Sequence, residues 1–313
     1  MSSEAMRAAV LSVAGSRATI RMDGERMGVV LDATGLPPAE RERLEAEVRA
    51  AAPAARVIVT AERVNRALIA VASGKGGVGK STVSANLAIA LARAGHRVGL
   101  IDADIYGPSQ PRLMAAEGIR PEAIEKQLIP VPTPYGVPLL SMGQLVEPGR
   151  AIAWRGPMAA GALGQLVEGA WGAADTLVMD LPPGTGDVQL TMVQKYRPAG
   201  AVIVSTPQDL ALIDATRAID FFNKAGVPII GLIENMAGYA CPHCGTVSDP
   251  FGRGGAESTA AALGLPFLGR VPLAIDIRQA SDAGRPPAAA ADDRIFAPLA
   301  AQVAEWLGQR NRG

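Results

Sequence analysis

A glycine-rich segment at residues 74–81 carries the strongest chemical signal in the sequence. Its sequence, GKGGVGKS, fits G-x-x-x-x-G-K-[ST] and leads from an apolar stretch into a helical pattern with apolar residues at Val83 and Leu87. Glycines let the backbone turn its N–H groups toward phosphate oxygens, and a helix N-terminus adds partial positive charge. Lys80 would neutralise the β- and γ-phosphates, and Ser81 would offer a hydroxyl to Mg²⁺. The segment predicts a site for Mg²⁺ and a nucleoside triphosphate.

The chain's two cysteines, Cys241 and Cys244, form a second chemical signal. They lie in the run C-P-H-C-G, where two thiolates can converge on a metal while the glycine permits a tight turn. Because a tetrahedral sulfur site needs four ligands and one chain supplies two thiols, a site shared by two chains across a two-fold axis is favoured. A bridging [4Fe–4S] cluster, a Zn²⁺ ion and a free redox pair all fit. We expect His243 to be an exposed loop residue.

Composition excludes several classes of function. The 313 residues include 30 Lys and Arg against 30 Asp and Glu, so charge gives no reason to expect binding to nucleic acid or to an anionic membrane. Only five of the basic residues are lysines, and two of them, Lys75 and Lys80, lie within six residues of each other. No apolar run approaches the ~18–20 residues that span a bilayer. The N-terminus does not resemble a signal peptide, and we expect a cytoplasmic protein.

Short apolar strands that alternate with helical segments must position these residues. Each strand candidate is followed by Gly, Pro, Asp or Asn, and ligands bind beyond the carboxyl ends of such strands in open α/β sheets. The alternation predicts an α/β fold with a mostly parallel sheet flanked by helices. The candidates are Leu68–Ala72, Val98–Ile101, Leu139–Ser141, Thr176–Asp180, Ala201–Ser205, Ile229–Ile233 and Phe267–Val271.

A small α+β domain is predicted at residues 1–64, ahead of the larger domain at residues 65–313. Apolar residues at helical spacing also occur at 294–312, where we expect a helix that packs against the larger domain. In the small domain we expect strands at Ala8–Val13, Arg17–Met22, Met27–Leu31 and Arg56–Thr60, a turn at Asp23-Gly24, and a helix at Ala39–Ala52.

The second lysine of the glycine-rich segment, Lys75, makes the segment resemble the deviant Walker A ATPases, which include MinD, ParA, ArsA and the nitrogenase iron protein. The resemblance implies that Lys75 reaches across a homodimer to the partner's nucleotide and that ATP promotes dimerisation. It also implies that Asp104, after the strand at 98–101, orients the attacking water, with Asp102 near Mg²⁺. Lys75, Lys80, Asp102 and Asp104 are thus the expected catalytic residues.

The same resemblance assigns two further residues at strand ends. Asp180 would be the Walker B acid that holds Mg²⁺ through water, and it leads into a switch II-like run at residues 181–187. Asn235 follows the strand at 229–233 and would hydrogen-bond the adenine. The expected nucleotide-binding residues are Gly74, Lys75, Gly76, Gly77, Val78, Gly79, Lys80, Ser81, Thr82, Asp180 and Asn235, with Ser81 and Asp180 on Mg²⁺.

Three longer runs resemble one family within that branch, the Mrp/ApbC iron–sulfur cluster carrier ATPases. They are DADIYGPSQPRLM, MDLPPGTGDVQLTM and GLIENMAGYACPHCG, and the match covers about residues 66–290. The resemblance implies a homodimer that hydrolyses ATP slowly, holds a [4Fe–4S] cluster on Cys241 and Cys244 of both chains, and passes it to apo-proteins. The small domain resembles a degenerate MIP18-like domain, with Ala33–Pro38 where such domains often carry a cysteine.

Two other functions stay open at this stage. A MinD/ParA-type ATP-dependent positioning switch with a structural zinc knuckle would need a basic amphipathic tail, and residues 294–312 hold few basic residues. An electron carrier similar to nitrogenase reductase would need two well-separated cysteines per chain. We expect neither a nucleic acid nor a membrane as a partner.

Overall fold

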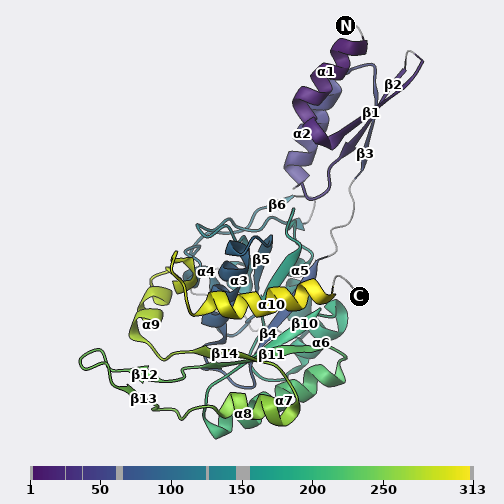
Figure 1. Ribbon diagram of the computed structural model, residues 1–313. Coiled ribbons are helices and arrows are strands. Elements are labelled where there is room, and N and C mark those ends of the chain that lie inside the picture. Colours follow the sequence, from purple (N-terminus) through teal and green to yellow (C-terminus); the bar gives the residue numbers. More distant parts are fainter. Residues whose placement is uncertain are drawn as a thin grey trace.

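A seven-stranded sheet forms the centre of the computed structural model, which describes residues 3–24, 26–36, 38–60, 66–124, 127–145 and 156–310 (Figure 1). The strand order is β14-β11-β10-β4-β9-β5-β8, and each pair of neighbours is parallel. All seven strands expected from the sequence form, and the sheet is wholly parallel. The strands are β4 (Ala67–Ala72), β5 (Val98–Asp102), β8 (Leu139–Ser141), β9 (Thr176–Asp180), β10 (Gly200–Ser205), β11 (Ile229–Asn235) and β14 (Phe267–Val271).

Helices cover both faces of this sheet. Alternate strand residues enter two apolar layers, so that Ile69 and Val71 lie in one and Leu68 and Ala70 in the other. The helices α3 (Lys80–Arg93) and α10 (Phe296–Arg310) cover the first face. The second face is covered by α5 (Gly156–Val167), α6 (Asp187–Tyr196), α7 (Asp209–Lys224) and α8 (Gly255–Leu263). Burial on both faces is why the strands are short, continuous apolar runs.

Shorter elements complete this part of the chain. The helices α4 (Gln110–Leu113) and α9 (Ile275–Asp282) contact each other. The others are the two-residue strands β6 (Ala123–Ile124), β7 (Gln127–Leu128), β12 (Tyr239–Ala240) and β13 (Val247–Ser248), and the 3₁₀ turns η2 (Met142–Gln144) and η3 (Pro287–Ala289).

The C-terminal helix α10 packs as expected. Its apolar stripe, Phe296, Leu299, Val303 and Leu307, is buried in the same apolar layer as α3. The stripe is therefore used within the fold. Among the described residues, no helix combines the length and apolar character that crossing a membrane requires.

A second, three-stranded sheet lies in the N-terminal region, with the strand order β1-β2-β3. The strands β1 (Ala18–Asp23) and β2 (Arg26–Asp32) are antiparallel and joined at the expected turn, while β3 (Arg56–Thr60) runs parallel to β2. The helices α1 (Ser3–Ala14) and α2 (Pro38–Ala51) contact each other, and both contribute to a separate apolar cluster with these strands (Figure 1).

The strand expected at Ala8–Val13 is wrong, because these residues lie within α1. Met6, Val10 and Ala14 are spaced four apart and share the face that packs into the N-terminal cluster. Alanine-rich sequence also favours a helix. The run at residues 8–13 is too short to reveal the helical period, which becomes visible only when Met6 and Ala14 are included.

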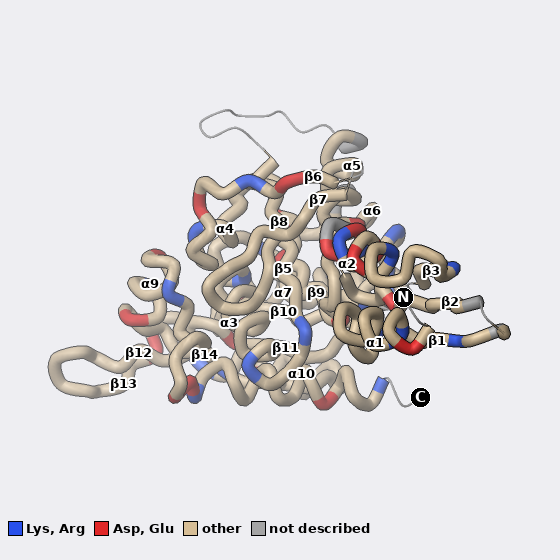
Figure 2. The backbone as a smooth tube through the Cα atoms, turned by 90° about the horizontal axis from the view of Figure 1, so that it is seen from above, with Lys and Arg blue, Asp and Glu red and all other residues tan. Residues whose placement is uncertain are grey.

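Charges of both signs are interleaved along the backbone, as on α2, where Arg43 pairs with Glu47 and Arg49 with Glu45 (Figure 2). One projecting segment differs: the β12–β13 hairpin contains no Lys, Arg, Asp or Glu between residues 239 and 248.

Candidate nucleotide site and thiol hairpin

The phosphate cradle, as we call residues 74–82, joins β4 to α3. Gly77 and Gly79 adopt φ values of +81° and +79°, which favour glycine. A Cβ atom on Gly79 would lie 2.1 Å from Asn235 Nδ2, and one on Gly74 would lie 2.1 Å from the Asp214 backbone. The sequence pattern G-x-x-x-x-G is thus required by close packing as well as by the turn.

A cavity of about 340 Å³ opens above the cradle. It lies at the carboxyl ends of the parallel strands, where the fold class predicts a ligand. Seven of its lining residues are predicted nucleotide-binding residues and Asp104 is a predicted catalytic one: Lys75, Gly76, Gly77, Gly79, Lys80, Ser81, Thr82 and Asp104. The other lining residues are Ser73, Gly107, Ser109, Leu113, Pro183 and Asp282.

Beneath the cavity, Lys80 forms a buried ion pair with Asp180 at the end of β9. Lys80 Nζ lies 2.5 Å from Asp180 Oδ1, and Lys80 is 6% exposed. Ser84 Oγ donates to the same carboxylate oxygen at 3.0 Å. The predicted phosphate-binding lysine and the predicted Walker B acid are therefore in contact, and Ser81 beside them supplies the oxygen chemistry that Mg²⁺ prefers.

Asp102 is fully buried next to Asp180, because the two residues are register partners on β5 and β9. Its carboxylate accepts hydrogen bonds from Ser141 Oγ at 2.9 Å and from the Gln110 backbone N–H at 3.1 Å. Burial, and then the Asp180 charge, raise the pKa of Asp102 to about 7. Two buried carboxylates thus lie next to each other beneath the cradle, and a divalent cation nearby would offset their mutual repulsion.

Gln110 belongs to the same buried cluster as Asp102 and Asp180, and it was not singled out from the sequence. Its side-chain Nε2 donates to Ser81 O and to Asp180 Oδ2, at 2.9 Å each. Gln110 is the first residue of α4, a helix of four residues, and although it lies in the run DADIYGPSQPRLM, nothing in that run assigns it a role. Its role becomes visible only where α3, β9 and α4 meet.

Lys75 and Asp104 lie at the rim of the cavity. Lys75 Nζ is 3.5 Å from Gln208 Oε1, a long hydrogen bond that leaves the half-exposed lysine weakly held. Asp104 Oδ1 accepts from the backbone N–H groups of Tyr106 and Gly107, at 3.0 and 3.1 Å. Both predicted catalytic groups therefore face the same cavity as the cradle.

Asn235 lies against the cradle at the end of β11. Its Nδ2 donates to Val78 O at 2.7 Å, and the residue is buried. The contact ties the strand that precedes the cysteine pair to the phosphate cradle. Hydrogen bonding of Asn235 to adenine stays a prediction.

The cysteine pair lies on the thiol hairpin, as we call residues 239–248, formed by β12 and β13. Cys241 N–H donates to Thr246 O at 2.9 Å, and Gly245 N–H donates to Cys241 O at 2.8 Å, closing a tight turn. Cys241 is half-buried and Cys244 is exposed, and His243 is exposed as expected. The hairpin extends away from the main sheet (Figures 1 and 2).

The Cys244 thiol has a favourable environment for its ionised form. Its Sγ lies 3.3 Å from Thr246 Oγ1. Hydrogen bonds from Thr246, and a smaller one from Cys241, lower the pKa of Cys244. Within the described ranges no group of three or more His, Cys, Asp or Glu side chains could hold a metal ion. The hairpin therefore presents two thiols and no third ligand from those residues.

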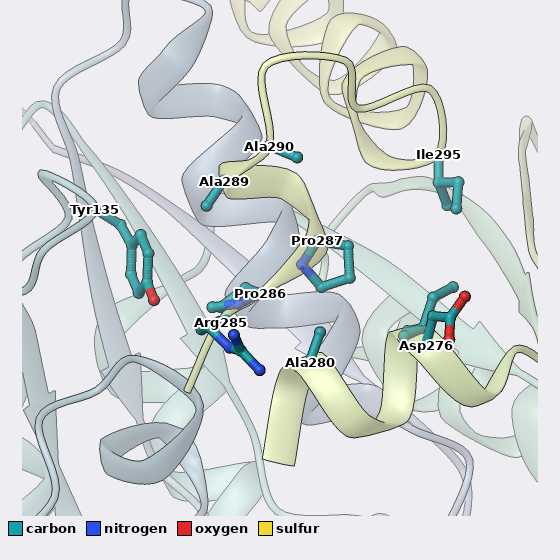
Figure 3. Close-up of a pocket in the computed structure, with 10 residues that line it drawn as sticks. Tyr135, Asp276, Ala280, Arg285, Pro286, Pro287, Ala289, Ala290 and Ile295 are labelled. Carbon is teal, nitrogen blue, oxygen red and sulfur yellow. The ribbon is translucent and has the colours of Figure 1, made fainter. Parts of the chain in front are cut away.

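A larger hollow of about 630 Å³ lies elsewhere, between α9, η3 and Tyr135 (Figure 3). Asp276 and Arg285 are its charged residues, and the rest of the lining is largely apolar. None of the residues predicted for the nucleotide or the cysteine site lines it.

Comparison with known proteins identifies close relatives. The family model described as ParA: NUBPL iron-transfer P-loop NTPase matches residues 64–307. The chain is 49% identical over 245 residues to a Pseudomonas fragi protein named iron-sulfur cluster carrier protein, covering 77% of this chain and 85% of that one. It is 51% identical over 221 residues to an Arabidopsis thaliana protein named iron-sulfur protein required for NADH dehydrogenase, mitochondrial, covering 70% of each.

Solved structures agree with the fold. A nucleotide-binding protein from Archaeoglobus fulgidus in complex with ADP is 40% identical, with a TM-score of 0.62, over 70% of this chain and 86% of that one. MinD from Pyrococcus horikoshii, complexed with Mg-ADP, has a TM-score of 0.58 at 21% identity, over 78% of this chain and 98% of that one, and is similar in fold alone.

Proposed function

Since the chain belongs to the family of NUBPL iron-transfer P-loop NTPases, as its resemblance to the Mrp/ApbC carriers implies, we propose that it is an ATP-hydrolysing iron–sulfur cluster carrier. Two chains would hold one [4Fe–4S] cluster between their thiol hairpins and transfer it to apo-proteins. The thiol hairpin is the observation that carries this proposal, because it presents two accessible thiols, one with a lowered pKa, on a segment without charged side chains.

In this proposal the cluster is the cargo that the protein delivers. Its ligands would be the thiols of Cys241 and Cys244, and the exposed position of Cys244 suits transfer to an apo-protein. Structural zinc sites are closed by four protein ligands, whereas each hairpin offers two thiols. An incoming thiolate of an apo-protein can reach an exposed Cys244 without unfolding the hairpin. Names of relatives support the same reading, since the Pseudomonas fragi protein is named a cluster carrier.

The phosphate cradle would bind MgATP. Backbone N–H groups of the cradle and Lys80 would hold the phosphates, and Ser81 and, through water, Asp180 would hold Mg²⁺, which neutralises phosphate charge when it is bound. A triphosphate would draw Lys80 away from Asp180 Oδ1 and free that oxygen for the metal's water. Oxygen donors and the crowded carboxylates of Asp102 and Asp180 fit such a cation.

Hydrolysis would need the groups at the rim. Asp104 would orient the attacking water, and Lys75, weakly held at 3.5 Å from Gln208, would reach the nucleotide of the partner chain. The Asn235–Val78 contact would let the nucleotide state of the cradle reach the strand that leads to the thiol hairpin. We also propose a cytoplasmic location for the protein. We further propose that a small MIP18-like domain at residues 1–64 precedes an ATPase domain at residues 65–313.

Anaerobic reconstitution with iron and sulfide tests the proposal. We expect wild type to take up iron and sulfide and to pass them to an apo-protein that requires a four-iron cluster. Cys241→Ala combined with Cys244→Ala should abolish both while ADP binding stays within about twofold, because the hairpin lies outside the cavity. Equal iron uptake by the double variant would refute the carrier role. Tightly bound zinc without iron would favour the zinc-knuckle positioning switch.

A further inference from the structure

Gln110 places an amide between two elements of the nucleotide site, and its bonding leaves one atom without a partner. Its side-chain Nε2 contacts Ser81 O and Asp180 Oδ2, at 2.9 Å each. Its backbone N–H contacts Asp102 Oδ2 at 3.1 Å. The residue is fully buried, and Gln110 Oε1 has no hydrogen-bond partner among the described residues.

The orientation of this amide follows from its neighbours. A backbone carbonyl and an ionised carboxylate only accept hydrogen bonds, so both must face the NH₂ group of Gln110. The carbonyl oxygen of the amide is then left on the other side. Buried polar atoms without partners are rare in proteins, and they indicate a ligand, an ion or a water molecule that completes the bonding.

The residues around Gln110 indicate which kind of hydrogen-bond donor would pair with its Oε1. Ser81 and Asp180 are the two residues proposed to hold Mg²⁺, and the Gln110 amide contacts both. Mg²⁺ keeps several of its waters in protein sites, and each such water is a strong hydrogen-bond donor. A Mg²⁺-bound water is therefore the donor whose chemistry fits an acceptor in this place.

We propose that Gln110 is a positioning residue for Mg²⁺: its Nε2 fixes Asp180 Oδ2, and its Oε1 accepts a hydrogen bond from a water of the metal's shell. The inference rests on the proposed binding of Mg²⁺ and nucleotide. It adds a residue that the phosphate-loop motif does not contain, on the helix that follows Asp104. Gln110 would thereby tie the segment after β5 to the metal.

Gln110→Met tests this role, because methionine keeps the side-chain length and removes both amide functions. The quantity to measure is the Mg²⁺ dissociation constant of the protein–ADP complex, by calorimetric titration of Mg²⁺ into protein saturated with ADP. We expect it to rise about tenfold, as for other groups that orient metal ligands. ADP affinity in EDTA should stay within about twofold of wild type.

Gln302→Met is the control, since Gln302 is a glutamine of α10 whose Nε2 donates to Leu268 O at 2.6 Å, and neither residue lines the cavity above the cradle. Its Mg²⁺ constant should not change. Should Gln110→Met fail to fold, Gln110→Asn keeps the amide but shortens the side chain, so it cannot span Ser81 and Asp180 and should also weaken Mg²⁺.

Two outcomes would overturn the inference. One is an unchanged Mg²⁺ constant in a folded Gln110 variant, and the other is an equal loss of ADP affinity with Mg²⁺ and in EDTA, which would indicate a structural role only. Failure of the proposed nucleotide site looks different, because wild type would then bind no ADP, and failure of the proposed carrier role would appear as absent iron uptake with ADP and Mg²⁺ binding unchanged.

Discussion

Lys80 and Cys244 are both predicted to hold a charged ligand, yet their surroundings differ. Lys80 is 6% exposed and already ion-paired within its own chain, among side chains that come from α3, β9 and α4. Cys244 is exposed on a two-stranded hairpin and is bonded only to its immediate neighbours in the sequence. One chain thus supplies a nearly complete phosphate cradle but, at the thiol hairpin, two thiols, which we propose to be half of a site shared with a second chain.

This contrast suggests how one chain can hold a nucleotide firmly at one site and release a cluster from another. A buried, preorganised site holds its ligand without large rearrangement, whereas an exposed half-site depends on a second chain and can open again. In our account the nucleotide is bound by the first kind of site and the cluster by the second.

Lys75→Ala should have the largest effect. It removes the one cation of the cradle that is weakly held within its own chain, and a cation supplied in trans contributes about 10³-fold or more to hydrolysis. We expect ATP turnover to fall about 10³-fold while ATP affinity changes less than threefold. Lys224→Ala, on a surface ion pair with Asp220, serves as the control. Equal ATP turnover in Lys75→Ala and wild type would show that Lys75 does not act on the nucleotide of a partner chain.

Lys80→Ala should affect stability as well as binding. It leaves Asp180 buried without its cation, a change that costs about 3–5 kcal/mol in other proteins. We expect a loss of that order in the free energy of unfolding, measured by urea denaturation, and no detectable ATP binding. Iron uptake by the thiol hairpin should persist. If the folded Lys80→Ala variant still binds ATP, residues 74–82 are not the site that binds its phosphates.

A pair of glycine variants compares the two regions directly. Gly79 and Gly245 both have positive φ, +79° and +72°, but a Cβ on Gly79 would meet Asn235 and one on Gly245 would meet open space. Gly79→Ala should cost about 2–3 kcal/mol, from backbone strain and displacement of Asn235, and Gly245→Ala about 1 kcal/mol, from strain alone. Similar losses for both variants would show that the cradle is no more tightly packed than the hairpin.

Thr246→Val should give the smallest effect, confined to the thiol hairpin. It removes the main hydrogen bond that lowers the pKa of Cys244, so that pKa should rise. At neutral pH a smaller fraction of the thiol is then ionised, and alkylation should slow, while the plateau rate at high pH stays unchanged. The rate is best followed against pH in a Cys241→Ser background. If the protein with Thr246 intact, in the same Cys241→Ser background, gives an identical pH profile, the Thr246 hydroxyl does not lower the pKa of Cys244.

Much of the fold was predictable because the main-sheet strands are apolar on both faces. Val98–Asp102 and Thr176–Asp180 are fully buried, so their sequences contain no competing polar period. Ala8–Val13 was mistaken because it is a short part of a helix whose apolar face, with Met6 and Ala14, extends beyond it. Local patterns were sufficient for the uniformly buried strands and also for β3, whose buried and exposed residues alternate, and they failed in α1, where the helical period is longer than the apolar run.

The motifs of the site were predictable, but the side-chain contacts that support it within the chain were not. The glycines and Lys80 follow from the chemistry of phosphate binding, which a continuous segment can supply. Gln110, Ser141 and Thr246 act through side-chain hydrogen bonds to Asp180, Asp102 and Cys244, respectively. Such partners are set by where distant segments meet or by how one turn closes, and a lone glutamine, serine or threonine has no distinguishing pattern in sequence.

The central claim is that the thiol hairpins of two chains complete one cluster site. Iron and sulfide content per chain, measured together with the native mass of the anaerobically reconstituted protein, tests it most directly. We predict about two iron atoms per chain in a dimer that carries one four-iron cluster, and loss of that cluster in the double cysteine variant. Four iron atoms on a monomer, or one zinc ion per chain and no iron, would contradict the account.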